Sequence, residues 1–226
     1  MSSTTRYILI ASVFVVLIIG FTIFTVLQIK ARKLKKRILI EEANLDENDP
    51  ITKELIERTE VGEMIWELKD QIKNPIDDLS MEYFITNIIR NGYKSVWIEG
   101  ETEGYEAITL AKRTKANISL LKGSIKDTEK FNKWLKEFDV PKDKIEIVEK
   151  KFIKDKFDFI ILSKETTNFN SAFDNSWVNV NKNGMLIIAE CKKLTRDQKD
   201  LIKYMKLIGV RFEHQKIHEG FIIAAK

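Results

Sequence analysis

Short apolar runs alternate with amphipathic stretches through most of the chain after residue 94. Apolar runs of four to six residues that end in polar or turn-forming residues are typical of strands. Apolar positions spaced three or four apart are typical of helices that cover a sheet. The expected strands are 95–99, 117–121, 145–148, 157–162 and 185–190, and the expected helices are 105–113, 126–138, 169–180 and 195–208. This alternation predicts an α/β fold with a mostly parallel sheet and helices on both faces.

The chain ends differently, in two strand-like runs at 210–217 and 220–225. So few residues separate these runs that no crossover helix fits between them, and the two strands must be antiparallel. The pattern therefore predicts a Rossmann-like, mostly parallel seven-stranded sheet that ends in an antiparallel hairpin.

Residues 7–29 contain no charged side chain. A helix of this length spans about 34 Å, enough to cross the hydrocarbon core of a bilayer. Lys30-Ala31-Arg32-Lys33 follows at once, where a signal peptide would have a cleavage site between small residues. We therefore expect a single transmembrane helix that is retained as an anchor.

The net charge of +4 is unevenly distributed. Seven Lys or Arg and no acid lie within residues 1–37, which leaves −3 for residues 38–226. The positive-inside rule places the residues after the anchor in the cytoplasm, so a single-pass membrane protein is expected. The basic cluster Lys30–Arg37 is expected to contact anionic lipid headgroups, and no specific nucleic-acid binding is predicted.

Between the basic cluster and the first strand the chain is acidic, with eighteen Asp or Glu against six Lys or Arg in residues 41–109. Asp49-Pro50 is typical of a helix start, and residues 51–73 have approximately helical apolar spacing. A second helix is expected at 81–90, ended by Asn91-Gly92. The expected organisation is an anchor (1–29), a basic juxtamembrane cluster with an acidic helical spacer (30–79), and a globular domain (80–226).

Few residues suggest metal or nucleophile chemistry. Cys191 is the single cysteine and is expected to be a packing thiol, while His214 and His218 are expected to be structural or surface residues. No metal site is predicted. Residues 112–156 carry fourteen Lys or Arg against eight acids, which is read as a solvated surface, with an anionic partner as the alternative.

The most informative stretch is 96–107, where an apolar run ends in a turn with Gly100 and Gly104 and a helix-like pattern follows. Strand, tight turn and helix form the entry unit of doubly wound α/β folds, whose ligands sit at this turn. Glu101, Glu103 and Glu106 would repel a pyrophosphate, which disfavours a nicotinamide-dependent dehydrogenase.

This layout resembles the class I S-adenosylmethionine-dependent methyltransferases, in particular the small-molecule O-methyltransferase-like branch, over about residues 80–226. The family's first motif is roughly an acid, a hydrophobic residue and a run of spaced glycines ending in Gly-Tyr. Gly100 and Gly104-Tyr105 match it, as residues 156–161 and 183–188 match the fourth and fifth strands. With its anchor, the chain also resembles a group of membrane-bound methyltransferases of wall-less bacteria.

The resemblance implies S-adenosylmethionine as cofactor, whose sulfonium and ammonium groups tolerate acids in the turn. It also implies cofactor contacts at seven positions along the carboxyl ends of the strands. These are Glu99, Gly100, Thr102, Gly104, Tyr105, Lys122 and Ser163.

Several positions depart from the family pattern. Thr102 replaces the middle glycine and limits how closely the backbone approaches a ligand. The acid expected at Ile98 is Glu99, one residue late, so its side chain should point to the opposite face of the sheet. Lys122 and Lys151 stand where the family has carboxylates for the ribose and near the adenine.

Methyl transfer depends mainly on alignment of a nucleophile with the sulfonium methyl group, so few catalytic groups are required. No general base is identified, and Glu165 or Ser163 would be the first candidates. Ser163-Lys164-Glu165-Thr166 replaces an Asn-Pro-Pro-Tyr-like motif, which disfavours methylation of a base or amide nitrogen. Two functions remain open: a membrane-anchored methyltransferase with degenerate cofactor motifs, or an inactive methyltransferase-like scaffold tethered to the cytoplasmic face of the membrane.

Overall fold

The structure is a computed structural model that describes residues 20–25, 30, 49–62, 64–72, 75–141, 143–149, 156–163, 168–189, 195–216 and 220–226. The chain divides into two compact units, Met1–Arg58 and Thr59–Lys226. Residues 59–79, assigned to the spacer from the sequence, belong to the same unit as the sheet.

In the first unit, residues 20–25 are helical and α2 spans Pro50–Glu57. The Asp49 side chain accepts a hydrogen bond from the Thr52 N–H and Pro50 occupies the first turn, as the sequence predicts. The predicted transmembrane helix, residues 7–29, lies outside the described residues except for 20–25. Within the described part of the chain, no helix has the length and apolar character needed to cross a membrane.

The continuous helical pattern at 51–73 is broken in the structure. Helix α2 ends at Glu57, and the four-residue helix α3 spans Trp66–Lys69. Gly62 adopts φ +78 between them, a left-handed conformation that a helix excludes. Helix α4 then runs from Asp78 to Arg90 and ends at Asn91-Gly92, as expected.

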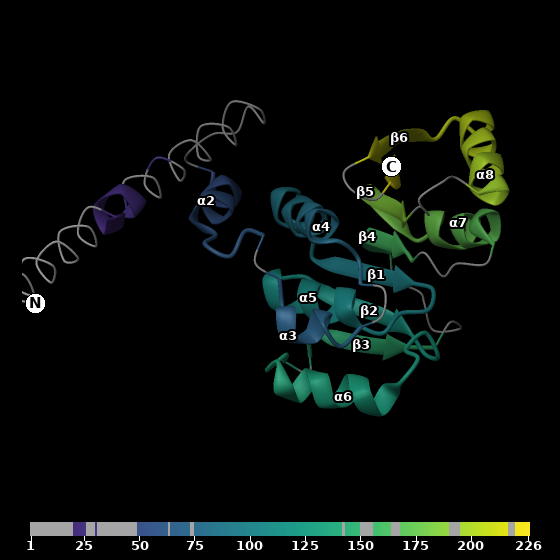
Figure 1. Ribbon diagram of the computed structural model, residues 1–226. Helices are drawn as coiled ribbons and strands as arrows, with labels where there is room; N and C mark the ends of the chain where they lie inside the picture. Colours follow the sequence, from purple (N-terminus) through teal and green to yellow (C-terminus); the bar gives the residue numbers. More distant parts are fainter. Residues whose placement is uncertain are drawn as a thin grey trace, which may run out of the picture. The chain divides into compact units, whose positions relative to one another are not determined.

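The second unit is built around one seven-stranded sheet (Figure 1) with the strand order β3-β2-β1-β4-β5-β7-β6. The first five strands are parallel, and β7 pairs antiparallel with both β5 and β6. The predicted closing hairpin is therefore confirmed. The strands are β1 Ser95–Glu99, β2 Asn117–Leu121, β3 Ile145–Val148, β4 Phe157–Leu162, β5 Val180–Ala189, β6 Arg211–Lys216 and β7 Gly220–Ala225.

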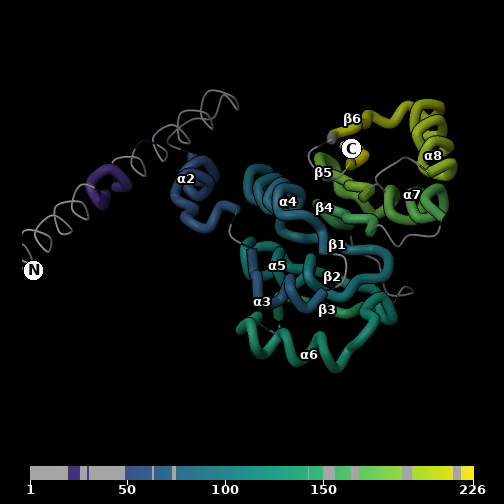
Figure 2. Tube along the Cα trace, in the orientation of Figure 1, coloured from purple at the N-terminus to yellow at the C-terminus, as the bar shows by residue number. Residues whose placement is uncertain are grey.

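Helices cover both faces of the sheet because adjacent strand residues point to opposite sides. On one face, Phe84 of α4 packs edge-on against Phe159 and Phe221. On the other face, Trp97 shares a core with Phe173 and Leu201. The remaining helices are α5 Tyr105–Arg113, α6 Thr128–Glu137, α7 Phe169–Trp177 and α8 Arg196–Leu207, the last with a complete capping box at Thr195. The tube in Figure 2 shows α6 running beside the β3 edge of the sheet.

One strand begins earlier than its sequence predicts. Asn183-Gly184 reads as a turn before a strand at 185–190, whereas β5 starts at Val180 and contains both residues. Asn183 adopts φ +66, and a Cβ on Gly184 would lie 2.9 Å from the Asp158 carbonyl oxygen. The pair forms an irregularity within the strand, where the register against β4 shifts.

The Asp158 side chain of β4 links the amino ends of neighbouring strands by hydrogen bonds. Its carboxylate accepts hydrogen bonds from the Lys94 and Ser95 amides, the Ser95 hydroxyl and the Asn181 side chain, at 2.6–3.1 Å. Burial favours the neutral acid, but these hydrogen bonds outweigh it and lower the pKa of Asp158. Asp158 thus joins β4 to the start of β1 and to β5, at the end of the sheet opposite the candidate site.

Candidate functional site at the carboxyl ends of the strands

The turn between β1 and α5 is shaped by two glycines. Gly100 adopts φ +104 and Gly104, the N-cap of α5, adopts φ +99. Both conformations lie in the region that favours glycine. The chain therefore leaves β1, turns sharply at the carboxyl edge of the sheet and enters α5 directly.

Thr102 supplies the internal support of this turn. Its hydroxyl accepts a hydrogen bond from the Gly104 N–H at 2.9 Å and donates one to the Glu106 carboxylate at 2.7 Å. The bond to the Gly104 N–H closes a local turn over two residues just before α5, whose first turn has no side-chain cap. The hydroxyl at the family's middle-glycine position thus has a structural role in this chain.

The turn also pairs with the segment that follows β2. The Thr102 N–H donates to the Ser124 carbonyl at 2.9 Å, and the Lys126 N–H donates to the Thr102 carbonyl at 3.3 Å. These bonds make an isolated parallel bridge between Thr102 and Ile125. Thr102 is consequently only 6% exposed.

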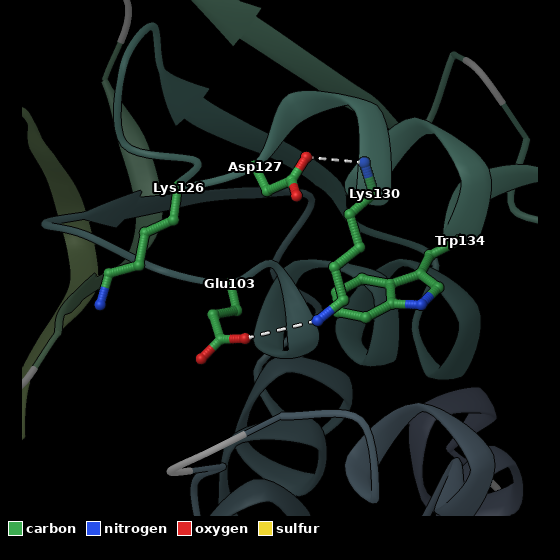
Figure 3. Close-up of a pocket in the computed structure, with 5 residues that line it drawn as sticks. All are labelled: Glu103, Lys126, Asp127, Lys130 and Trp134. Atoms are coloured by element: carbon green, nitrogen blue, oxygen red, sulfur yellow. Dashed lines mark hydrogen bonds and ion pairs between the residues drawn. The ribbon is translucent and has the colours of Figure 1, made fainter.

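Side chains of the same segment meet the neighbours of Thr102. Lys126 Nζ lies 3.4 Å from a Glu101 carboxylate oxygen, and Lys130 Nζ lies 3.9 Å from one of Glu103. Figure 3 shows Lys130 reaching from the first turn of α6 toward Glu103 across a hollow of about 320 Å³. A Cβ on Gly104 would lie 2.3 Å from the ring of Phe131, so Gly104 is needed for packing as well as for its φ.

Residues 101–104 thus each contact the segment Ser124–Phe131, which we call the α6 entry segment. Sequence reasoning found the turn and missed this segment. Lys126 and Lys130 belong to the Lys-rich stretch 112–156, and nothing in their spacing indicates the contacts with Glu101 and Glu103. Since the α6 entry segment fills one side of the turn, the side left for a ligand is that of Gly100, Glu99 and Ser163.

Glu99 ends β1 on the α7 side of the sheet. The Ser176 hydroxyl of α7 donates a hydrogen bond to its carboxylate at 3.4 Å, whereas Ile98 is buried on the opposite face. The one-residue shift of the acid therefore turns it to the other face, as the alternation predicts.

Ser163 follows β4 and joins the same edge. Its N–H donates to the Glu99 carbonyl at 2.9 Å and its hydroxyl donates to the Glu101 carbonyl at 3.2 Å. Of the predicted site residues, the structure thus brings Glu99, Gly100, Thr102, Gly104 and Ser163 together around the turn.

The other two predicted residues are placed differently. Lys122 is 70% exposed, and its Nζ lies 2.9 Å from the Glu149 carboxylate at the end of β3. Glu149 is a carboxylate beside β2 that the sequence did not suggest. The ring of Tyr105 is buried, and burial, followed by the charges of Asp78 and Glu106, raises its pKa. A ligand at this turn could therefore meet Tyr105 only through its main chain.

Other sequence-predicted residues, Lys151, Glu165, Cys191 and His218, lie outside the described residues. Within the described ranges no group of three or more His, Cys, Asp or Glu side chains is arranged to hold a metal ion. On the open side of the turn the described residues offer the Glu99 carboxylate and the Ser163 hydroxyl, while the lysines nearby are paired with Glu101, Glu103 and Glu149. This chemistry suits a ligand with positive charge and hydroxyl groups better than a pyrophosphate.

No protein-family model matches the sequence, and no curated protein matches it either. Solved structures of methyltransferases do match its fold. A methyltransferase from Geobacter sulfurreducens superposes with a TM-score of 0.58 at 12% identity, covering 83% of this chain and 93% of its own. An O-methyltransferase from Bacillus cereus in complex with S-adenosylhomocysteine superposes with a TM-score of 0.55 at 13% identity, covering 82% and 94%.

A third match is the methyltransferase PaMTH1 from Podospora anserina, bound to S-adenosylhomocysteine. Its TM-score is 0.55 at 14% identity, covering 70% of this chain and 84% of its own. At such low identities the likeness concerns the fold alone. The chain has the α/β Rossmann-like fold of these methyltransferases, with the mostly parallel seven-stranded sheet and antiparallel end that the sequence predicts.

Proposed function

We propose that residues 59–226 form an S-adenosylmethionine-dependent methyltransferase domain that binds its cofactor at the β1–α5 turn. The observation that carries the proposal is the sheet order, with antiparallel β7 between β5 and β6 and a glycine turn at the carboxyl edge of β1. Open α/β sheets bind ligands at this edge, next to the point where the strand order reverses. The fold neighbours named above include two that are bound to S-adenosylhomocysteine.

The residues around the turn suit the methionine end of this cofactor. Glu99 places a negative charge on the open side of the turn, which favours an ammonium or a sulfonium group, whereas Glu101 and Glu103 are paired with Lys126 and Lys130. Gly100 lacks a side chain where the chain turns, and the Ser163 hydroxyl lies within 3.2 Å of the Glu101 carbonyl. The bound cofactor would supply the methyl group, and these residues would orient it.

The nucleoside end is less conventional. Lys122 stands where the resemblance implies a ribose carboxylate, but Glu149 brings a carboxylate to within 2.9 Å of its ammonium group. A ribose hydroxyl could be accepted by Glu149 while Lys122 holds the carboxylate in place. A carboxylate from Glu149 in place of the missing one supports nucleoside binding although Lys122 departs from the family pattern.

A scaffold that no longer binds cofactor is the second candidate. It is favoured by the α6 entry segment, which satisfies the turn's charges and backbone groups without any ligand. A turn so fully paired is stable on its own, as an inactive methyltransferase-like module requires. The two candidates differ in whether the Glu99 side of the turn accepts S-adenosylmethionine.

We further propose that residues 7–29 anchor the protein in a bilayer as a single span. Lys30–Arg37 would then lie against anionic headgroups, with the methyltransferase-like domain in the cytoplasm. The uncharged stretch and the basic cluster that follows it support this arrangement.

Replacement of Glu99 by Gln tests the role of the turn. The variant keeps an acceptor for Ser176 but removes one negative charge, so S-adenosylmethionine should bind about ten-fold more weakly, as loss of a charge-assisted hydrogen bond predicts. The matched control is Glu146→Gln, an exposed residue of β3, which should leave binding unchanged. Equilibrium dialysis with the full-length protein measures both, and equal affinities for the two variants would place the ligand elsewhere.

A further inference from the structure

The segment Met64–Ile72 precedes the sheet and contains α3. We call it the strap. Met64, Ile65 and Leu68 are 4%, 6% and 0% exposed, so their side chains are built into the core of the second unit. The strap is thus a fixed part of this unit, although the sequence groups it with the spacer.

The end of the strap is attached to α6 by two hydrogen bonds that Gln71 accepts from Trp134 and Lys130. The Trp134 indole N–H donates to the Gln71 side-chain oxygen at 3.1 Å. Lys130 Nζ donates to the Gln71 carbonyl oxygen, also at 3.1 Å, and lies 4.5 Å from the centre of the Trp134 ring. Trp134 is 1% exposed, so Gln71 provides an acceptor for an indole N–H that water reaches poorly.

The residues held by Gln71 lie next to those that hold the turn. Lys130 also faces Glu103, and Phe131, between Lys130 and Trp134 in the same helix, fills the space beside Gly104. A displacement of the first turns of α6 would therefore change the contacts of both Glu103 and Gly104. Gln71 itself makes no described hydrogen bond to the turn, so its influence there must pass through α6.

A second contact joins the strap to α4, where Lys69 pairs with Asp78 in the first turn of that helix.

We propose that the strap supports the conformation of the β1–α5 turn, with Gln71 as the residue that positions α6 against it. The α6 entry segment holds residues 101–104 in the observed conformation. Without the Gln71 side-chain acceptor, the indole N–H of Trp134 loses its partner, and the first turns of α6, which carry Lys130 and Phe131, are held less firmly against the turn.

Amide hydrogen exchange of the full-length protein without cofactor tests this inference. The variant Gln71→Leu removes the acceptor for Trp134 and touches no residue of the turn. We expect it to speed exchange in a peptide covering residues 101–108 by about five-fold, the effect of one lost hydrogen bond on local opening. Lys130→Met, which also removes the contact with Glu103, should speed it at least as much.

The matched control is Lys133→Met, an exposed lysine of the same helix with no described contact to the strap or the turn. It should leave exchange in residues 101–108 unchanged. Faster exchange in residues 64–72 alone, or no change anywhere in Gln71→Leu, would overturn the proposal and leave the strap as a packing element.

The strap matters to function only if the turn binds cofactor, so its significance rests on the proposed function. The two remain distinguishable, because the exchange measurement contains no cofactor. A turn that loosens in Gln71→Leu but binds no S-adenosylmethionine would support the strap and contradict the methyltransferase proposal.

Discussion

Thr102 and Gly104 illustrate how a departure from a family motif can have a structural cause. The hydroxyl of Thr102 accepts a hydrogen bond from the Gly104 N–H within the turn, and Gly104 makes room for Phe131. Neither residue needs a ligand to explain it. Evidence for cofactor binding therefore has to come from Glu99, Gly100 and Ser163, on the other side of the turn.

Thr102→Val should destabilise the protein by about 1 kcal/mol, the usual net contribution of a buried side-chain hydrogen bond. The shape of the side chain is kept, and the bonds to Gly104 and Glu106 are lost. Thr102→Ser restores the hydroxyl and should recover most of the loss in urea unfolding. Equal stability of the Val and Ser variants would show that these bonds contribute nothing.

Gly104→Ala and Gly123→Ala form a matched pair. Both glycines have similar positive φ, +99 and +90, but only Gly104 has a neighbour within 4 Å of the added Cβ. Each substitution should cost about 1 kcal/mol in backbone strain. The Gly104 variant should lose about 1–3 kcal/mol more through overpacking against Phe131. Similar unfolding midpoints for the two variants would contradict the Phe131 contact.

At the scale of elements, the sequence predicted strands β1 to β4 with the bounds that the structure has. Each is a short apolar run ended by polar or turn residues, so local pattern decides its limits. The helix expected at 51–73 was wrong in its length: α2 ends at Glu57, where Arg58 adopts ψ 120, and Gly62 with φ +78 separates it from α3, whose Leu68 is buried in the sheet-containing unit. The early start of β5 was missed because Asn183-Gly184 is a turn signal that the pairing with β4 overrides.

The candidate site was predictable to a similar extent. Strand alternation was enough to place Glu99 on the α7 face. The partners of the turn, Lys126, Lys130 and Phe131, come from another element and depend on how α6 packs. The contact of Glu149 with Lys122 could not be predicted for the same reason, since it exists only when β2 and β3 pair in this register.

The hydrogen bonds of Asp158 between neighbouring strands make the stability of the fold depend on pH. Its hydrogen bonds lower its pKa in the folded state, so its stabilising contribution is complete above the unfolded value near 4 and is lost as pH falls below it. Asp158→Asn should therefore be less stable than the native protein at pH 7. The difference should shrink as pH is lowered from about 5 toward 3, which thermal unfolding across that range measures. A difference independent of pH would assign the effect to packing rather than to the carboxylate.

At the scale of the whole molecule, the chain combines a methyltransferase fold, a basic N-terminal cluster and an acidic stretch between them. The fold rests on the described sheet and its neighbours. Membrane anchoring rests on the composition of residues 7–37 and stays a prediction. The strap of residues 64–72 belongs to the sheet-containing unit and contacts α6 through Gln71.

The central claim is that the β1–α5 turn binds S-adenosylmethionine. Calorimetric titration of the full-length protein with S-adenosylmethionine and S-adenosylhomocysteine tests it most directly. The account predicts binding of both with dissociation constants in the micromolar range, about −8 kcal/mol. Absence of binding heat together with an unchanged unfolding temperature at millimolar cofactor would contradict it and leave the scaffold function.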